Sequence, residues 1–489
     1  MPLSDVPREI LLSIADQLDA KGINALCRTN SQLYNLLNEY LYRRDITQSE
    51  GPSESLLWAA TRKELPLSTS TAQRALEAGR HLDPIPECYH DALQMAADEG
   101  HVDVVKLLLK VDGINPNFAG GRLKSPPLVI AAEMGHSGVV ELLLAAVNID
   151  PNSRDQHSGS PLLYACRQRH VSIVKQLLDR DDVDLNAVGF GLSETPLLIA
   201  CREWCGEEVA NMLLNKAGIN VNVTNINGDT PLMLAVQSEK VSVVESLLAR
   251  DDMDPNNLNA FNYLGDHVLG SSVCQGNITI VKLLLSCPDI DVNFTAPGSH
   301  SALMLACKSG ASDMVRLLLG KDDILINQQD FDGLTPLCHA ASFAYLNDGY
   351  TEGHIDAIML LLHRDDIELN LPDNSGCTPL LWACSSLYLP VVDLFLKQDG
   401  IDPNVRSSNG YTPLAYTCLR PVNARAGASS DYRRKFVAIV QSLLSHRDID
   451  PNPVNNGVSL LDEVIEKFTP LYGDEIESLL RRKLSEGAN

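Results

Sequence analysis

The tripeptide Thr195-Pro196-Leu197 decides the fold, because it recurs along the chain at a nearly constant interval. Copies and close variants lie at 126–128, 160–162, 230–232, 301–303, 335–337, 378–380 and 412–414. More distant variants place a leucine at positions 57, 93, 269 and 461, which gives twelve leucine slots in all. Most steps between slots are 34 or 35 residues. A period of this length is typical of a repeat architecture, in which each unit packs on its neighbours.

Each period predicts two helices. A hydroxyl residue followed by proline matches the preferences of the cap and of the first position of a helix. About fourteen residues after each slot comes an apolar helical run, as in HVDVVKLLL (101–109) and ITIVKLLL (278–285). A breaker such as Gly100-His101 separates the two helices, and a polar turn with Asp, Asn and Gly follows the second. The chain is therefore expected to be all-α, with about twelve helix pairs and projecting hairpin loops.

This pattern resembles the ankyrin repeat in its spacing, its Thr-Pro-Leu opening, its Gly-His break and its Leu-Leu-Leu run. The resemblance covers about residues 55–484 and implies an ankyrin-repeat solenoid, which leaves 485–489 as a C-terminal tail. One unit inside the stack has His267-Val268-Leu269 in place of the usual opening, and we expect it to be a soft point.

Two long steps between slots predict insertions near 345–353 and 420–434. The second insertion is a basic island on an acidic chain. It is either a tolerated surface loop or a binding element. Its basic residues, with the adjoining lysine, are Arg420, Arg425, Arg433, Arg434 and Lys435.

Residues 1–46 lie outside the period, and 47–54 form a linker to it. The apolar residues of this N-terminal segment predict three short amphipathic helices. A module of about 45 residues buries too little surface to be stable alone, so it needs a partner for its apolar face.

The N-terminal segment resembles an F-box of the form that fungal ankyrin proteins carry. Val6-Pro7-Arg8-Glu9-Ile10-Leu11 occupies the place of the family's LPxEIL motif, and Leu41-Tyr42-Arg43-Arg44-Asp45 matches its end. In that family this segment packs on the small adaptor subunit of a cullin-RING ubiquitin ligase. The alternative is that the three helices only cap the first repeat. The resemblance implies an adaptor contact through Leu3, Pro7, Ile10, Leu11, Ile14 and Leu18.

Charge and hydropathy exclude several classes of partner. The 489 residues include 39 Lys and Arg against 63 Asp and Glu, a formal net charge of −24, which repels nucleic acid and anionic lipid. The longest apolar stretches, such as 142–147, are far shorter than a membrane-spanning helix. The first twenty residues are too charged for a secretory signal. We therefore expect an intracellular protein, cytoplasmic or nuclear, with reduced cysteines.

Enzyme motifs are absent from the sequence, which has no GxxxxGK, GxSxG or HExxH. Cysteines recur four residues after a slot, where sister repeats have alanine, so they are predicted to be compact core residues. Histidines recur at the helix break and are predicted to be structural. We therefore expect no catalytic, cofactor or metal site. The cysteines are Cys166, Cys201, Cys307, Cys384 and Cys418, and the histidines are His101, His136, His170 and His354.

These features favour a non-enzymatic substrate receptor, in which the ankyrin units hold a client protein and the F-box docks the ubiquitin ligase. Such tethering raises the effective concentration of the client at the ligase. The alternative is an ankyrin scaffold with no link to ubiquitin.

Four of the nine phenylalanines lie in turns and are candidate anchors for the client, unless each folds back onto a neighbouring hairpin. Pairs such as Asp181-Asp182 in the outer turns are either simply solvated or form an acidic edge that favours a client rich in Lys or Arg. The candidate anchors are Phe118, Phe190, Phe294 and Phe331.

Overall fold

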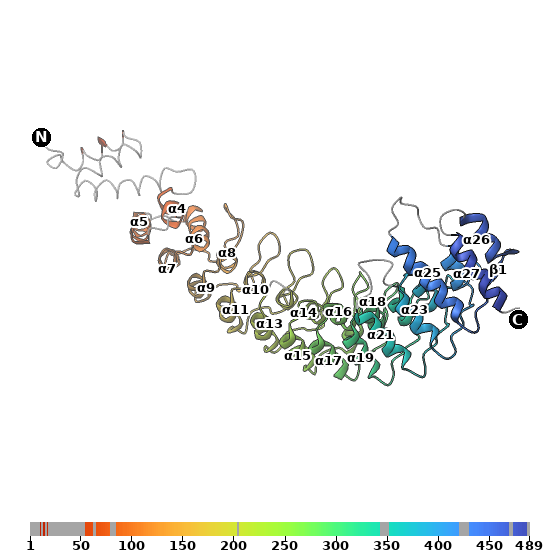
Figure 1. The fold of residues 1–489 in the computed structure, drawn as a ribbon. Helices are drawn as coiled ribbons and strands as arrows, with labels where there is room; N and C mark the ends of the chain where they lie inside the picture. The colour runs from red at the N-terminus through yellow and green to blue at the C-terminus, as the bar shows by residue number, and fades with distance from the viewer. Residues whose placement is uncertain are drawn as a thin grey trace. The chain divides into compact units, whose positions relative to one another are not determined.

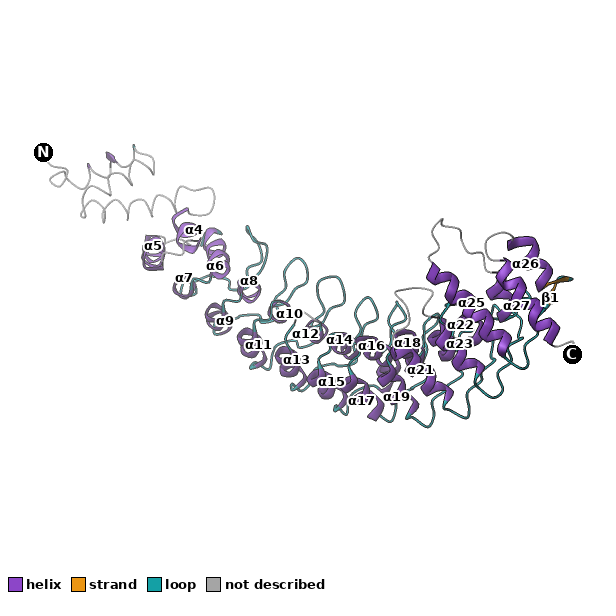
Figure 2. Cartoon of the chain, viewed as in Figure 1, coloured by secondary structure: helices purple, strands orange, loops and turns teal. Residues whose placement is uncertain are grey.

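The computed structural model describes residues 54–61, 65–78, 85–202, 205–342, 352–419, 430–468 and 473–486, together with Ile10, Ser13, Ile14 and Gln17. Helices dominate these ranges, as the repeat pattern predicts (Figure 2). None of the helices found there is both long and apolar enough to cross a membrane. The chain divides into two compact units, Met1–Ile226 and Asn227–Asn489.

The first unit contains five helix pairs within its described ranges. In each pair a first helix packs against a second helix, and first helices of successive pairs also pack together (Figure 1). The first helices are α4 (Glu54–Thr61), α6 (Cys88–Glu99), α8 (Pro127–Met134), α10 (Pro161–Arg167) and α12 (Pro196–Cys201). The second helices are α5 (Leu65–Ala78), α7 (Val102–Leu108), α9 (Ser137–Leu144), α11 (Val171–Leu178) and α13 (Glu207–Leu214).

The second unit contains seven helix pairs of the same kind. The first helices are α14 (Pro231–Gln237), α16 (Val268–Gln275), α18 (Ala302–Ser309), α20 (Pro336–Ser342), α22 (Pro379–Ser385), α24 (Pro413–Leu419) and α26 (Leu460–Phe468). The second helices are α15 (Val241–Leu248), α17 (Ile278–Ser286), α19 (Ser312–Leu319), α21 (Glu352–Leu362), α23 (Leu389–Leu396), α25 (Ser430–Ser445) and α27 (Gly473–Glu486). A 3-10 turn, η2 (Pro255–Asn259), and an antiparallel pair, β1 (Val454–Asn455) and β2 (Val458–Ser459), complete the elements, with Val454 opposite Ser459.

The Thr-Pro-Leu opening starts the first helices in the predicted way. The Thr230 Oγ1 accepts a hydrogen bond from the Met233 amide at 3.1 Å, and Pro231 occupies the first helical position. The threonine hydroxyl satisfies one of the backbone amides that have no partner at the helix start, and proline has no N–H that would need one. The equivalent cap forms at Ser160, Thr195, Ser301, Thr335, Thr378 and Thr412.

The leucine slots form the core of the stack. Eleven of the twelve slot leucines are at most 8 % exposed, whereas in the last pair Leu461 is half-buried and Leu460 takes the buried place. The five cysteines at the alanine position of the first helix are almost fully buried, which confirms their prediction as core residues. Burial raises the pKa of the Cys384 thiol to about 12, so it stays a neutral, compact side chain.

In eight of the described polar turns, an asparagine bridges to the next repeat. The Asn293 Nδ2 donates to the carbonyl of Asp323 at 2.8 Å, and its Oδ1 accepts from the amide of Leu325 at 2.8 Å. Two backbone groups of the following turn are therefore satisfied by one side chain. The polar composition of the turn did not predict this bridge between repeats. The same pair of bonds forms at Asn117, Asn152, Asn186, Asn259, Asn327, Asn370 and Asn404.

The Gly-His break also joins neighbouring repeats, because each of three histidine rings contacts the preceding repeat. The ring of His170 shares a hydrogen bond with the carbonyl of Glu133 in the preceding repeat at 3.0 Å. A Cβ on Gly135 would lie 2.5 Å from that ring, and the φ of +83° at Gly135 also favours glycine. His136 and His354 bond in the same way to the carbonyls of Asp98 and Lys308, which supports the structural role predicted for these histidines.

The predicted insertions coincide only partly with described residues. Most of the first and residues 420–429 of the second lie outside them. The prediction of a loop to residue 434 is wrong at its end, because α25 begins at Ser430. This helix has 16 residues, whereas most second helices have eight. Arg433, Arg434 and Lys435 are good helix formers, and they extend the helix on the N-terminal side of its apolar run. The Arg434 and Lys435 side chains are exposed.

We predict that Asn293→Ala lowers the free energy of unfolding of the chain by about 1–3 kcal/mol, because it leaves a backbone donor and a backbone acceptor with poorer partners. Chemical denaturation followed by circular dichroism measures the change. The control is Asn409→Ala, which alters an exposed hairpin asparagine and should have a much smaller effect. Equal destabilisation by the two variants would contradict the prediction.

We also predict that the chain becomes less stable as the pH falls below about 6.5. Burial lowers the pKa of His267 and His354 below the ordinary value of 6.5, so the unfolded state binds more protons in this range. The stabilisation by the neutral rings is complete above pH 6.5 and is lost as the pH falls through their folded-state pKa values.

Thermal unfolding between about pH 7.5 and pH 5 tests this, because most carboxyl groups titrate below that window. The melting temperature should be flat near pH 7 and decline toward pH 5. His267→Thr restores the usual cap of the repeat and removes one titrating ring, so its decline should be shallower. A melting temperature that rises on acidification would contradict the expected sign.

Candidate functional site

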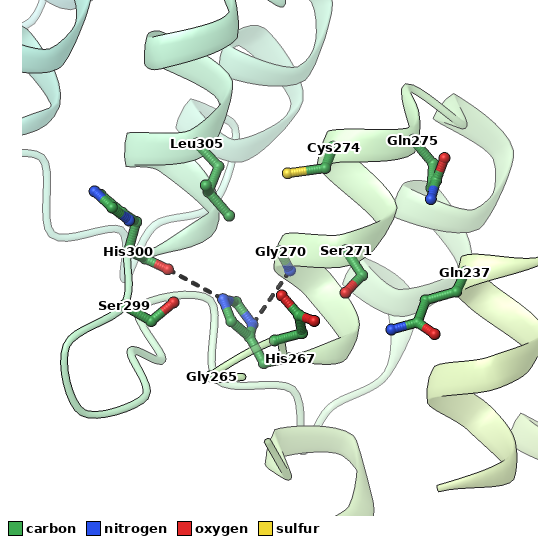
Figure 3. Close-up of a pocket in the computed structure, with 11 residues that line it drawn as sticks. Gln237, Gly265, His267, Gly270, Ser271, Cys274, Gln275, Ser299, His300 and Leu305 are labelled. Atoms are coloured by element: carbon green, nitrogen blue, oxygen red, sulfur yellow. Dashed lines mark hydrogen bonds between the residues drawn. The ribbon is translucent and has the colours of Figure 1, made fainter. Parts of the chain in front are cut away.

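The second unit contains a pocket of about 490 Å³ between first helices and hairpin loops. It is lined by Gly270, Ser271 and Cys274 of α16 and by Leu305 of α18 (Figure 3). Loop residues Ser299 and His300 complete the rim. The pocket therefore lies beside the first helix of a repeat that lacks the Thr-Pro-Leu opening.

Small side chains on α16 explain why the pocket is there. Ser271 lies four residues after the cap of its helix, where the other first helices from α8 to α24 have larger residues. Gly270 similarly replaces Met233 and Met304 of the neighbouring repeats. Loss of these side chains hollows the face between the loops and the helices. The residues at the Ser271 position in the sister helices are Ile130, Tyr164, Ile199, Leu234, Leu305, His339, Trp382 and Tyr416.

His267 takes the place of the threonine cap in this repeat. Its Nδ1 accepts a hydrogen bond from the Gly270 amide at 3.2 Å, so its Nε2 carries the proton and donates to the His300 carbonyl at 3.2 Å (Figure 3). The ring is therefore held as a neutral tautomer, and burial is the main cause of its lowered pKa. The unit expected to be a soft point thus keeps a helix cap, supplied by an imidazole.

Three of the four candidate phenylalanine anchors fold back onto the protein. The Phe118 ring lies 4.6 Å from His90, and the Phe190 ring packs edge-on against Tyr164 at 5.1 Å. Phe294 lies between Phe261 and His267, with its ring 5.4 Å from the His267 ring. These are the contacts expected from the fold-back alternative.

Phe331 is different, because its side chain is 81 % exposed at the tip of a hairpin loop. Sequence analysis missed two further exposed tip residues, Tyr263 at 84 % and Leu264 at 85 %. They are in the repeat without the Thr-Pro-Leu opening, so its departure from the pattern was the available indication. The hairpin tips of the second unit thus present three large apolar side chains to solvent.

Backbone hydrogen bonds between neighbouring loops hold these tips in place. The Tyr263 amide donates to the Asn227 carbonyl at 3.0 Å. The Asn374 amide donates to Asp332 at 3.0 Å, and the Asn374 side chain donates to the Phe331 carbonyl at 2.8 Å. The tip side chains are therefore presented from an ordered backbone, which reduces the entropy lost when a partner binds.

The outer turns carry a repeated acidic pattern. The Arg180 guanidinium donates to both carboxylate oxygens of Asp182, at 2.8 and 2.6 Å, and holds the pKa of that carboxyl below its usual range. Arg250 and Arg364 bind Asp252 and Asp366 in the same way. The pairs are therefore exposed but not simply solvated, because the second aspartate of each is occupied by an arginine. The first aspartates, Asp181, Asp251 and Asp365, are exposed.

Of the six predicted adaptor-binding residues, only Ile10 and Ile14 belong to the described part of the chain. Both have helical backbone, and their residues are 52 % and 41 % exposed. Leu3, Pro7, Leu11 and Leu18 lie outside the described residues.

Among the described residues one cluster could hold a metal ion, made by His300, Asp330 and His339. One ligand atom from each lies within 4.8 Å of the others. The sequence analysis, which expected no metal site, did not find this cluster, because its members come from two repeats and are separated by 30 and 9 residues.

Comparison with known families identifies the fold. The family model for ankyrin repeats (3 copies) matches in overlapping segments, 56–155, 128–225, 217–296, 269–348, 303–407 and 349–455. These matches span most of the chain. A comparison with curated proteins gives no match. Ankyrin repeats are modules of protein–protein interaction, and the chain belongs to the ankyrin-repeat family.

Proposed function

We propose that the chain is a receptor that binds a client protein on the hairpin tips and the adjoining pocket of its second unit. The observation that carries the proposal is the exposure of Tyr263, Leu264 and Phe331 on loops held by backbone hydrogen bonds. Loops that a rigid scaffold holds in place are where binding residues concentrate, and aromatic side chains presented there are suited to contact a partner. Aromatic and leucine anchors of this kind fill pockets in a partner.

The pocket beside α16 would accept one side chain from the client. Its polar rim, with Ser271, Ser299 and His300, offers hydrogen bonds, and Leu305 offers an apolar wall. A client segment that places one amphipathic side chain there would be held in register along the loops. This combination of exposed apolar side chains and a pocket with polar groups favours specific binding of one partner over non-specific hydrophobic binding.

Charge favours a client rich in Lys or Arg. The chain has a net charge of −24, and exposed aspartates recur in its outer turns. Such a surface accelerates the approach of a basic partner, and added salt weakens that effect. The association rate should therefore fall with ionic strength more than the dissociation rate rises.

The finer proposal is that the chain delivers this client to a ubiquitin ligase. It rests on the resemblance of residues 1–46 to an F-box and on the two exposed isoleucines, Ile10 and Ile14. The ankyrin units would hold the client while the N-terminal segment binds the ligase adaptor, so that client lysines stay close to the ligase. The chain itself would supply no catalytic group. The alternative is a scaffold without a ubiquitin link.

We predict that the triple variant Tyr263→Ser, Leu264→Ser, Phe331→Ser loses capture of the client while its melting temperature is unchanged, because these side chains have little contact in the free protein. Quantitative affinity purification of the tagged full-length chain, compared with the triple variant, measures the loss. Phe190→Ser, which removes a packed ring, should instead lower the melting temperature.

The matched control for the triple variant is Val147→Ser, an 82 % exposed apolar residue after α9. It should retain capture. If the triple variant and wild type capture the same proteins equally, the tip residues are not the binding site.

We predict that Ile10→Asp with Ile14→Asp lowers the affinity for a purified ligase adaptor by about tenfold or more, since a few central apolar residues dominate most interfaces. Surface plasmon resonance with the full chain measures it. Leu325→Asp, another exposed apolar position, should bind as wild type. Failure of the wild-type chain to bind the adaptor would favour the scaffold alternative.

A further inference from the structure

We propose that His300, Asp330 and His339 form a binding site for a divalent transition-metal ion, with Zn²⁺ as the best-matched ion. The site joins two successive repeats of the second unit, because His300 precedes α18 whereas Asp330 and His339 belong to the following repeat. His300 also lies on the rim of the proposed client pocket, but binding of the ion requires neither the client nor the ligase.

The geometry brings two imidazoles to one carboxylate oxygen. The Asp330 Oδ2 lies 2.7 Å from the His339 Nε2 and 3.7 Å from the His300 Nε2. The two rings lie edge-on with centroids 4.9 Å apart. Ligands of a tetrahedral zinc ion at 2.0–2.1 Å are about 3.3 Å from one another. Shifts of about 1 Å or less in the side chains would therefore place all three around one ion.

The Asp330 carboxylate is oriented in advance. Its Oδ1 accepts hydrogen bonds from the amides of Asp332 at 3.0 Å and Leu334 at 2.8 Å, which directs Oδ2 toward the histidines. Hydrogen bonds of this kind to a ligating carboxylate are a usual feature of metal sites. His267 in turn fixes the backbone of His300 through its hydrogen bond to the His300 carbonyl.

A purely structural role is the main alternative, because sister repeats contain a related bond. The Asp155 carboxylate accepts from the Tyr164 hydroxyl at 2.7 Å, and the Asp373 carboxylate accepts from the Trp382 Nε1 at 3.0 Å. His300 directly precedes the first helix cap of its repeat, Ser301. The equivalent residue is Ser125 for the Asp155 site and Leu334 for the Asp373 site, so neither site has a second imidazole. The recurring aspartate explains one bond of the cluster and leaves the presence of His300 unexplained.

The surroundings leave room for a fourth ligand. The His300 side chain is 28 % exposed and lies on the rim of the pocket, whereas those of Asp330 and His339 are 4 % and 5 % exposed (Figure 3). Three protein ligands with one position open to water match the two-histidine, one-carboxylate zinc sites. The charge of Lys308 opposes a cation at His300, and the charge of Asp332 favours one.

The test uses the full-length chain, stripped of metal with a chelator and kept reduced. Titration with Co²⁺ should give one equivalent of visible d–d absorption without a thiolate charge-transfer band, and Zn²⁺ should displace it. Zn²⁺ alone should raise the melting temperature. His300→Ala should fold and weaken Zn²⁺ binding by about tenfold or more in calorimetry.

Matched controls separate ligation from structure. Asp330→Asn and Asp373→Asn each remove a loop aspartate and should both lower the melting temperature, but only Asp330→Asn should lose the metal. His363→Ala and Cys274→Ser, which alter an exposed histidine and the pocket cysteine, should bind as wild type. The proposal is overturned if no saturable binding occurs at millimolar Zn²⁺, if His300→Ala binds as wild type, or if Cys274→Ser abolishes the absorption.

Discussion

In eight of the described turns, one asparagine side chain satisfies two backbone groups of the next repeat, and the stack depends on these bridges. Most helices have only six to nine residues, which is too short for stability in isolation. Their apolar faces are covered only when neighbouring pairs align, and the bridges fix that alignment at the turns. The Asn293 side chain satisfies a backbone donor and a backbone acceptor of the next turn, as a neighbouring strand does in a β-sheet. Burial of the slot leucines and of the other apolar residues of both helices then supplies most of the stabilisation.

The features with functional potential are departures from this shared framework. The framework needs Thr or Ser at the cap and a large residue four positions later, and α16 has His267 and Ser271 instead. The helix still forms, because the imidazole supplies the missing acceptor, and a pocket opens where the large residue is lost. The same reasoning applies to Phe331, whose position at a loop tip is unconstrained by packing between repeats. A rigid scaffold thus confines variation to the surface that partners reach.

The sequence predicted the helix pairs, the Thr230 type of cap, the core cysteines and the structural histidines, because each of these depends on local spacing. It could not predict which phenylalanines are exposed, since Phe190 and Phe331 both lie in turns, and only the fold brings Tyr164 and Arg167 against the Phe190 ring. The asparagine bridges were missed because their partners are 30 or more residues away. The cluster of His300, Asp330 and His339 was missed for the same reason: its members converge only after two repeats have stacked.

The asparagine bridge also bears on how such a chain can change its length. A bridged repeat such as the one with Asn152 carries the side chain that its successor needs and the backbone groups that its predecessor needs. A duplicated repeat therefore brings both halves of each new joint with it and requires no compensating substitution. Extra residues are accepted just as easily when they fall between the two helices of a repeat. The bonds from Asn327 to Asp366 and from Asn404 to Asp448 span 39 and 44 residues instead of 30, yet keep donor–acceptor distances of 2.7 and 2.6 Å. The length of a repeat can therefore vary between its two helices while the asparagine hydrogen bonds to the next repeat keep the same geometry.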